Sequence, residues 1–580
     1  MKKLVVLFLL IISCADKNPE TVERDFTTVF EKSEGTETAT YEETIAYYEA
    51  LADAYSEISI KEMGMTDSGK PLHIVTLNMD GNFDLQSVKN TGNIILINNG
   101  IHPGESDGID ATMMLFRDIA GGKIPAPDHT TLVTIPIYNI GGSLNRNSTT
   151  RTNQNGPTSY GFRGNARNYD LNRDFIKSDT KNARAFAEIF HIVKPDVFID
   201  NHVSNGADYQ YTLTHLFTQH NKLGGVVGEF LHTKMMPQLE QKLTEKSWDI
   251  TPYVNVFNST PESGFSQFMD SPRYSTGYTT LWNTLGMMVE THMLKPYKQR
   301  VEGTYELMVS MLELTEEHGE AIKSLRVAQN DAMMASTTYP IQWQIDTTQT
   351  STLNFKGYEG TRLPSEVTNG DRLYFDKGKP FTKETEYRNY FKSKKDIVVP
   401  KGYIIPQGWH NVIDLLKLND VSMTEFEKDS TILVESYKID TYESRRAPYE
   451  GHYLHYNTTV KASEQNITVN AGDYYVETRQ ESMRYIIETL EPEAVDSFFN
   501  WNFFDTILQQ KEGFSPYVWE DKAKLLLAQN PQLQIDFNLR KSFDEDFAKN
   551  WYAQLDWLHK QSDNYEKAHM QYPIYRVLAE

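Results

Sequence analysis

The chain has 580 residues, and its 57 Lys and Arg against 79 Asp and Glu give a formal net charge of −22. This length predicts two or three domains, and 39% hydrophobic residues exclude wholesale disorder. The acidic balance argues against nucleic-acid binding and against broad adsorption to anionic lipid, because both partners are negatively charged. The single cysteine, Cys14, excludes an intramolecular disulfide and a cysteine-based structural zinc site.

The N-terminus has the pattern of an export signal. Lys2 and Lys3 precede an apolar run from Leu4 to Ile12, which is too short to span a bilayer but suits the apolar part of a signal peptide. The segment Ile11-Ile12-Ser13-Cys14 resembles a bacterial lipobox, in which the cysteine is lipidated. We therefore expect a signal peptide over 1–13 and an exported lipoprotein, facing the periplasm or in the outer membrane. Its contact with the membrane would be the lipid on Cys14.

Residues 14–40 are rich in Thr and Glu and predict an acidic linker. Helical and strand patterns then alternate to about residue 335, which indicates an α/β sheet with helices on both faces. Helices are predicted over 41–56, 109–120, 183–193 and 305–333, and strands over 72–77, 94–97, 132–138, 197–199 and 287–289.

The pattern changes beyond residue 335. Residues 336–478 contain short runs typical of strands, such as 432–434, 453–460 and 467–469, separated by Gly, Pro and Asp. Residues 479–580 form a mixed, α-rich segment with many aromatics. These aromatics could present a surface for glycan or peptide, but at helical spacing they are more often core. The predicted order is therefore an α/β domain over 41–335, a β-rich domain over 336–478 and a mixed segment over 479–580.

Several motifs carry metal-binding residue types. His102-Pro103-Gly104-Glu105 follows the strand at 94–97, and on a tight loop its His and Glu can turn toward one cation. Alone, this spacing is a weak signal. His202, however, comes just after the strand at 197–199, and sites in open α/β sheets collect at the carboxyl ends of the strands. Two His and one Glu form a catalytic zinc set with an open position.

Two further motifs carry residues suited to carboxylate binding and proton transfer. In Asp170-Leu171-Asn172-Arg173-Asp174-Phe175, the arginine offers a planar fork for a carboxylate and the asparagine an additional donor. Glu290 ends an apolar strand, where a glutamate can act as general base for an activated water.

Together these motifs resemble the zinc metallocarboxypeptidase family (peptidase family M14), in an order that matches that family. The segment from Gly64 to Leu72 also resembles the family's early turn and strand, with Thr66 where the family usually has Ser. The resemblance covers roughly residues 41–330. It implies an α/β/α sandwich around a mixed, mostly parallel sheet.

The resemblance also implies roles for individual residues. His102, Glu105 and His202 would bind one Zn²⁺, and Glu290 would be the general base. Asn172 and Arg173 would hold the terminal carboxylate of the substrate, and Asp170 would orient the first zinc histidine.

Three assignments stay open. The family uses an arginine upstream of the Asn-Arg pair to stabilise the oxyanion, and Arg146, Arg151, Arg163 and Arg167 are all available. We favour Arg151.

The family also has a mobile tyrosine before the catalytic glutamate. We favour Tyr278 over Tyr274, with a packed tyrosine as the alternative for either. Arg273 lies where residues of the side-chain pocket are expected and would favour acidic side chains there; the alternative is a solvated arginine.

The sequence thus predicts a lipid-anchored, zinc-dependent metallocarboxypeptidase that removes C-terminal residues from peptides in the bacterial cell envelope. One alternative is a zinc amidase acting on cell-wall peptides or N-acyl amino acids. The other is a non-catalytic lipoprotein that binds peptide or glycan. The expected partner is a peptide with a free C-terminal carboxylate, and the oligomeric state is left open.

Overall fold

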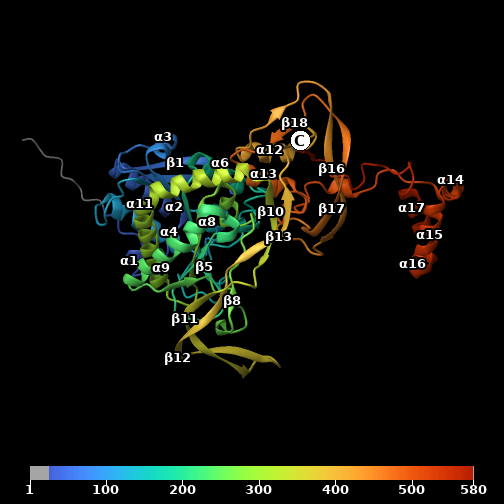
Figure 1. Ribbon diagram of the computed structural model, residues 1–580. Helices are drawn as coiled ribbons and strands as arrows, with labels where there is room; N and C mark the ends of the chain where they lie inside the picture. The colour runs from blue at the N-terminus through green and yellow to red at the C-terminus, as the bar shows by residue number, and fades with distance from the viewer. Residues whose placement is uncertain (1–24, 579–580) are drawn as a thin grey trace, which may run out of the picture.

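The computed structural model describes residues 25–578 (Figure 1). The predicted signal peptide and Cys14 lie outside the described residues. Within 25–578, no helix has the length and apolar character needed to cross a membrane.

Within the described range, the largest sheet has eight strands in the order β1-β2-β4-β3-β5-β9-β6-β7. Its four central strands are mutually parallel, whereas β1-β2, β2-β4 and β6-β9 are antiparallel. The bounds are β1 Ile58–Met65, β2 Pro71–Leu77, β3 Asn93–Asn98, β4 Thr130–Ile135, β5 Val197–Ser204, β6 Leu213–Phe217, β7 Ile250–Pro252 and β9 Leu285–His292.

Helices cover both faces of this sheet. Every residue of β3 and β5 is buried, as strands covered on two sides require. On one face Phe198 of β5 contacts Phe186 of α6, and on the other Asn201 contacts Met308 of α11. The predicted sandwich around a mixed, mostly parallel sheet is therefore confirmed.

The helices of this part differ widely in length. The longest, α11, begins eight residues earlier than its pattern predicted, because Tyr297 and Val301 are also buried against the core. The bounds are α1 Val29–Lys32, α2 Tyr41–Ala54, α3 Leu85–Thr91, α4 Asp107–Ala120, α5 Ile140–Leu144, α6 Lys181–Val193, α7 His220–Leu223, α8 Gly225–Phe230, α9 Met236–Glu245, α10 Ser275–Thr279 and α11 Tyr297–Ala335, with short 3-10 or π turns at Leu171–Arg173, Leu231–Met235, Pro261–Ser263 and Thr280–Trp282.

Residues 25–40 differ from the predicted linker. Phe30 is buried and its ring lies against Tyr297, and Glu31 pairs with Arg117 at 2.6 Å. This segment is thus packed on the α/β domain, because its few apolar residues find partners there that composition does not reveal.

The region beyond α11 builds three further sheets, one of which also includes the short strand β8 from before α11 (Figure 1). In the described chain these are β10-β13, the hairpin β11-β12 joined by β8, and a six-stranded sheet in the order β15-β18-β14-β19-β16-β17. The bounds are β8 Phe265–Ser266, β10 Thr338–Ile345, β11 Ser351–Pro364, β12 Asp371–Arg388, β13 Phe391–Val398, β14 Gly402–Ile405, β15 Thr424–Glu425, β16 Ser430–Ser444, β17 His455–Val469, β18 Tyr474–Glu477 and β19 Tyr575–Val577.

The predicted limit at 478 does not separate two units. β19, near the C-terminus, pairs with β14 and β16, and Phe498, Phe499 and Trp501 are fully buried in the main core. The helices are α12 His410–Leu418, α13 Met483–Leu490, α14 Pro516–Gln529, α15 Pro531–Phe543, α16 Glu545–Lys549 and α17 Trp551–Lys560, with a 3-10 turn at Asp505–Leu508.

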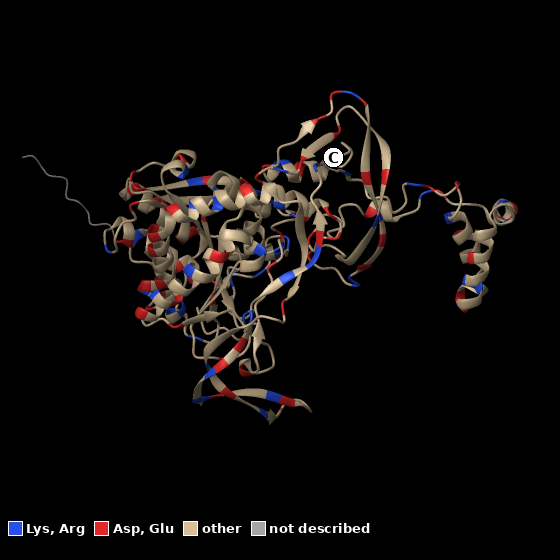
Figure 2. Ribbon diagram, in the orientation of Figure 1, with Lys and Arg blue, Asp and Glu red and all other residues tan. Residues whose placement is uncertain are grey.

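The last four helices form a small unit of their own, set apart from the rest in Figure 1. Its core is a separate cluster around Trp519, Phe537 and Leu558. Acidic and basic residues are spread over all parts of the fold (Figure 2), so the net charge of −22 is not confined to one segment.

Candidate active site

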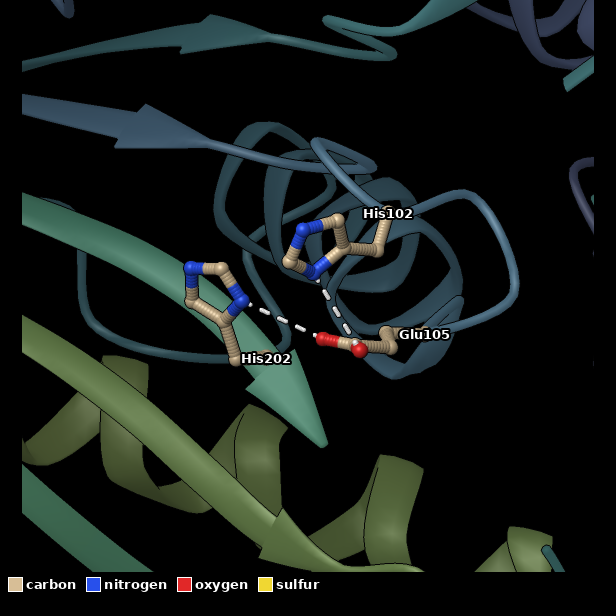
Figure 3. A group of neighbouring side chains, drawn as sticks. All are labelled: His102, Glu105 and His202. Atoms are coloured by element: carbon tan, nitrogen blue, oxygen red, sulfur yellow. Dashed lines mark hydrogen bonds and ion pairs between the residues drawn. The ribbon is translucent and has the colours of Figure 1, made fainter. Parts of the chain in front are cut away.

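His102, Glu105 and His202 converge at the carboxyl ends of β3 and β5 (Figure 3). Glu105 Oε1 lies 3.2 Å from His102 Nδ1, and Glu105 Oε2 lies 3.1 Å from His202 Nδ1. One donor atom of each residue lies within 4.8 Å of the others, and all three side chains are buried. His202 lies on β5 itself, not after it, because pairing with β9 continues to Ser204.

Each histidine is oriented by a second carboxylate. His102 Nε2 donates to Asp170 Oδ1 at 2.9 Å, and His202 Nε2 donates to Asp200 Oδ2 at 2.8 Å. With the ring proton on Nε2, each Nδ1 presents its lone pair to the centre of the group. This is the arrangement in which carboxylates fix metal-binding imidazoles.

These residues fit a divalent metal ion. His102 Nδ1 is buried and makes no hydrogen bond within the described chain, which suits a ligand atom. Burial opposes ionisation of Glu105, but its contacts with His102 and Arg151 outweigh this effect and hold its pKa well below the usual range. An ionised carboxylate and two imidazole nitrogens are the donor types of catalytic zinc sites.

A glycine lets the loop between the ligands fold closely. A Cβ at Gly104 would lie 2.5 Å from Arg151 Cδ and 3.0 Å from the carbonyl oxygen of Gly161. Any larger residue would therefore push apart the loop that carries His102 and Glu105.

Glu290 lies beside the metal-binding group. It is on β9, where it is the register partner of His202 on β5, so both side chains leave the sheet on the same face. Burial raises the pKa of Glu290 to about 7, since the lowering by His202 is partly offset by Glu105. Such a carboxylate can take and return a proton near neutral pH.

Asn172 and Arg173 stand on a single 3-10 turn, Leu171–Arg173, capped by Asp170. The Arg173 guanidinium lies 4.5 Å from the ring centroid of Tyr274, and Asn172 Oδ1 accepts from the Ser275 amide at 3.3 Å. We call Asn172 and Arg173 the clamp, since both could bind a substrate carboxylate. Contacts from the segment 273–275, as well as from the 3-10 turn itself, hold the clamp in place.

The candidate metal ligands and the carboxylate-binding pair open into one cavity of about 570 Å³. It contains the three metal-binding residues, Asn172, Arg173 and Glu290. Apolar side chains line another part of it, among them Leu216, Phe268 and Met288. A ligand in this cavity can thus meet a metal, a general base and a carboxylate clamp at once.

Curated proteins similar to this chain are carboxypeptidases. No protein-family model matches the chain. A carboxypeptidase 2 from Trichophyton rubrum is 22% identical over 530 residues, which cover 84% of this chain and 87% of that protein. A carboxypeptidase 2 from Trichophyton equinum is 22% identical over 440 residues, covering 70% and 72%. The resemblance to the metallocarboxypeptidase family is confirmed.

Solved structures of metallocarboxypeptidases are similar to part of this chain. That of Burkholderia cenocepacia is 18% identical and covers 48% of this chain and 70% of its own, with a TM-score of 0.37. That of Pseudomonas aeruginosa is 13% identical and covers 49% and 70%, with a TM-score of 0.36.

The structure separates the four upstream arginines. Arg146 donates to the carbonyl oxygens of Thr38, Ala39 and Ser159, and Arg167 lies over the ring of Tyr169, so neither lines the cavity. Arg151 and Arg163 both do.

The two cavity arginines differ in how many of their nitrogens are engaged. Arg151 is 13% exposed and donates to Glu105, Gln154 and the carbonyl of Val203. Arg163 is 45% exposed and is held on one side by Asp170 at 2.9 Å. Its remaining nitrogen, Nη1, lies 3.6 Å from Glu105, beyond hydrogen-bond distance.

The structure differs from the prediction for Tyr278. This residue is fully buried, packs against Phe175, Phe190 and Trp282, and donates to Asn419 at 2.6 Å. It lies in the core because α10 turns its side chain toward α6 and not toward the cavity. Tyr274 does line the cavity, as does Tyr253.

Arg273 does not line the cavity in the described chain. Its Nε donates to Asp496 at 2.8 Å and its guanidinium lies 4.9 Å from the ring of Trp501. Arg273 therefore does not favour acidic side chains from within the cavity, and it is buried, not solvated.

Sequence reasoning missed Asp200 as the partner of His202. The signal was present: in Asp200-Asn201-His202 the two outer residues share a strand face because side chains alternate along a strand. Tyr253 follows the short strand β7 and carried no such signal.

Proposed function

We propose that the protein is a zinc-dependent metallocarboxypeptidase that hydrolyses the C-terminal peptide bond of peptides. The observation that carries the proposal is the common cavity of the metal-binding group, Glu290 and the Asn172–Arg173 pair. A general base or a metal site alone would fit many hydrolases. The added carboxylate clamp favours removal of terminal residues.

Individual residues of the site have separate roles in this reaction. A bound zinc ion supplies Lewis-acid chemistry, which polarises a carbonyl and makes water more acidic. Glu290 takes a proton from the attacking water and delivers it to the leaving amine. His102, Glu105 and His202 would hold the metal. Asp170 and Asp200 fix the orientation of the two imidazole rings.

The Arg163 guanidinium, whose Nη1 lies 3.6 Å from Glu105, suits the developing oxyanion. A donor aimed at the charge that appears during reaction lowers the barrier, whereas a donor already engaged cannot respond. Because Arg151 is held by three partners, its role is more consistent with orienting Glu105. The favoured sequence assignment, Arg151, and the structural candidate, Arg163, are thus distinct hypotheses.

The apolar side chains predict a preference at the substrate terminus. Leu216 and Met288 are cross-strand neighbours on β6 and β9. The ring centroids of Phe268 and Tyr274 are 5.0 Å apart. Burying a terminal Phe or Leu side chain there is favourable by about 1.5–3 kcal/mol. An acidic or basic terminal residue would find no opposite charge among these apolar residues.

Peptides of one sequence, with free or amidated C-termini, test the proposal. We expect release of the last residue from the free forms, faster for terminal Phe or Leu than for Glu or Lys, with little release from the amides. A chelator should stop the reaction and added Zn²⁺ restore it, as followed by mass spectrometry of the products.

Replacing Arg173 with Ala sharpens the same experiment. Loss of a charge-assisted, bidentate contact should reduce kcat/KM on free peptides by about tenfold or more and leave the slow amide reaction nearly unchanged. Equal losses on both peptides would contradict the exopeptidase assignment. Rapid cleavage of amidated peptides or N-acyl amino acids would favour the amidase alternative instead.

We also propose that the enzyme acts at the bacterial cell envelope as a lipoprotein anchored through Cys14. The support is the sequence alone: the charged start, the short apolar run and the lipobox-like segment before Cys14. Replacing Cys14 with Ser in the full chain should move the protein from the membrane fraction to the soluble fraction. Recovery of the variant in the membrane fraction at the wild-type level would contradict the anchor.

A further inference from the structure

The loop between β16 and β17, residues 445–454, packs against the back of the clamp-bearing segment, residues 169–180. Glu450 Oε2 accepts a hydrogen bond from the Asp170 amide at 2.9 Å. The approach is close: Gly451 has φ +79°, and a Cβ there would lie 2.6 Å from the Tyr169 hydroxyl oxygen. The loop therefore holds the backbone of the residue that orients His102 and caps the Asn172–Arg173 turn.

A chain of ion pairs makes a second connection from the same loop. His452 Nε2 lies 2.7 Å from Asp179 Oδ2, and Asp179 lies 2.6 Å from Lys177 Nζ. Lys177 is fully buried and pairs with Asp174 at 2.6 Å. Asp174 is the residue after Arg173, so this chain of contacts ends directly beside the clamp.

A third connection reaches the clamp through Tyr274, whose ring lies against the Arg173 guanidinium. Asp496 accepts from both the backbone amide and the guanidinium of Arg273, at 2.9 and 2.8 Å. Trp501 donates to the same carboxylate at 3.2 Å. Next in the chain, Tyr274 lies over the Arg173 guanidinium. Residues beyond 335 thus fix the clamp segment from two sides.

In the described chain, Glu450, His452, Asp496 and Trp501 do not line the cavity. They can act on substrate only through the residues that they hold. The similarity to the Trichophyton rubrum protein covers 84% of the chain and so extends beyond the α/β part.

We propose that the region beyond residue 335 is a built-in brace for the substrate-carboxylate subsite, with Glu450 as a positioning residue for Asp170 and the Asn172–Arg173 turn. This inference rests on the proposed exopeptidase function. Loss of the hydrogen bond to the Glu450 carboxylate frees the turn that aims the clamp. The effect should therefore fall on recognition of the free carboxylate.

Three variants of Glu450 test this proposal against a matched control. Glu450→Ala removes the acceptor, Glu450→Asp draws it back by one methylene, and Glu450→Gln keeps a carbonyl in place to accept from Asp170. Glu464→Ala, at an exposed position on β17, is the control. All are measured in the full-length protein with Zn²⁺ present.

The readouts are the KM and kcat for free peptides, and calorimetric affinity for free and amidated peptides in a Glu290→Gln background. We expect Glu450→Ala and Glu450→Asp to raise KM and to weaken binding of the free peptide by about 5- to 20-fold. Amidated peptide should bind as before, Glu450→Gln should restore most of the affinity, and Glu464→Ala should behave as wild type.

Equal weakening for free and amidated peptides, or no weakening at all, would overturn the brace. In one outcome, the wild type hydrolyses peptides while the Glu450 variants prefer the free over the amidated peptide as strongly as the wild type does. In that case the brace fails and the proposed function stands. If wild type hydrolyses nothing but prefers the free carboxylate in a Glu450-dependent way, the proposed function fails and the brace stands.

Discussion

Replacing Glu290 with Gln is expected to reduce kcat by about 10²- to 10⁴-fold, because glutamine cannot accept the proton of the attacking water. KM should change little, since the clamp and the apolar residues remain. Steady-state kinetics on a free peptide ending in Phe checks this. Glu320→Gln, an exposed change on α11, is the matched control.

The pH dependence of kcat/KM provides an independent test of Glu290 as the general base. Glu290 acts as a base only when ionised, so kcat/KM must rise with pH through its pKa. Burial raises that pKa to about 7, and the positive charge of a bound metal acts in the opposite direction. The acidic limb is therefore expected at or below pH 7 and should disappear in Glu290→Gln. A variant that keeps more than a tenth of the activity, or the same limb, would argue for another base.

Replacing Arg163 with Ala is expected to lower kcat by about 10²- to 10³-fold, the usual cost of losing one oxyanion donor. Arg151→Ala should lower kcat by less than about tenfold and weaken zinc retention, because its Nη1 holds Glu105 at 2.8 Å. Kinetics and metal content of the two variants decide between them, and added guanidine should partly restore Arg163→Ala.

Arg167 provides the control for this pair, because it lies over Tyr169 and away from the cavity. Arg167→Ala should keep wild-type kcat. If Arg151→Ala shows the larger loss of kcat, the original sequence assignment is correct and Arg163 serves mainly to hold Asp170.

The sequence by itself determined the α/β architecture and much of the candidate site. Buried strands such as 94–97 are recognisable because a strand covered on both faces is continuously apolar. His102, Glu105, His202 and Glu290 stand at or near the ends of such strands, where the topology of the sheet brings them together. Local pattern and sheet geometry, together with the resemblance to the metallocarboxypeptidase family, therefore singled out these residues.

Tertiary structure alone decided what local pattern cannot encode. Tyr274 and Tyr278 are four residues apart, yet one lines the cavity and the other packs in the core, because Tyr274 precedes α10 in extended backbone whereas Tyr278 lies within the helix. Arg151 and Arg163 differ in the partners that hold them, not in spacing.

The longest-range contacts were the least visible in the sequence. Arg273 meets Asp496 across 223 residues, and the Asp170 amide meets Glu450 across 280. No periodicity links such pairs, since they meet only after two separately patterned regions have packed together. For this reason the sequence identified the residues of the candidate site, whereas the fold showed which distant region supports them.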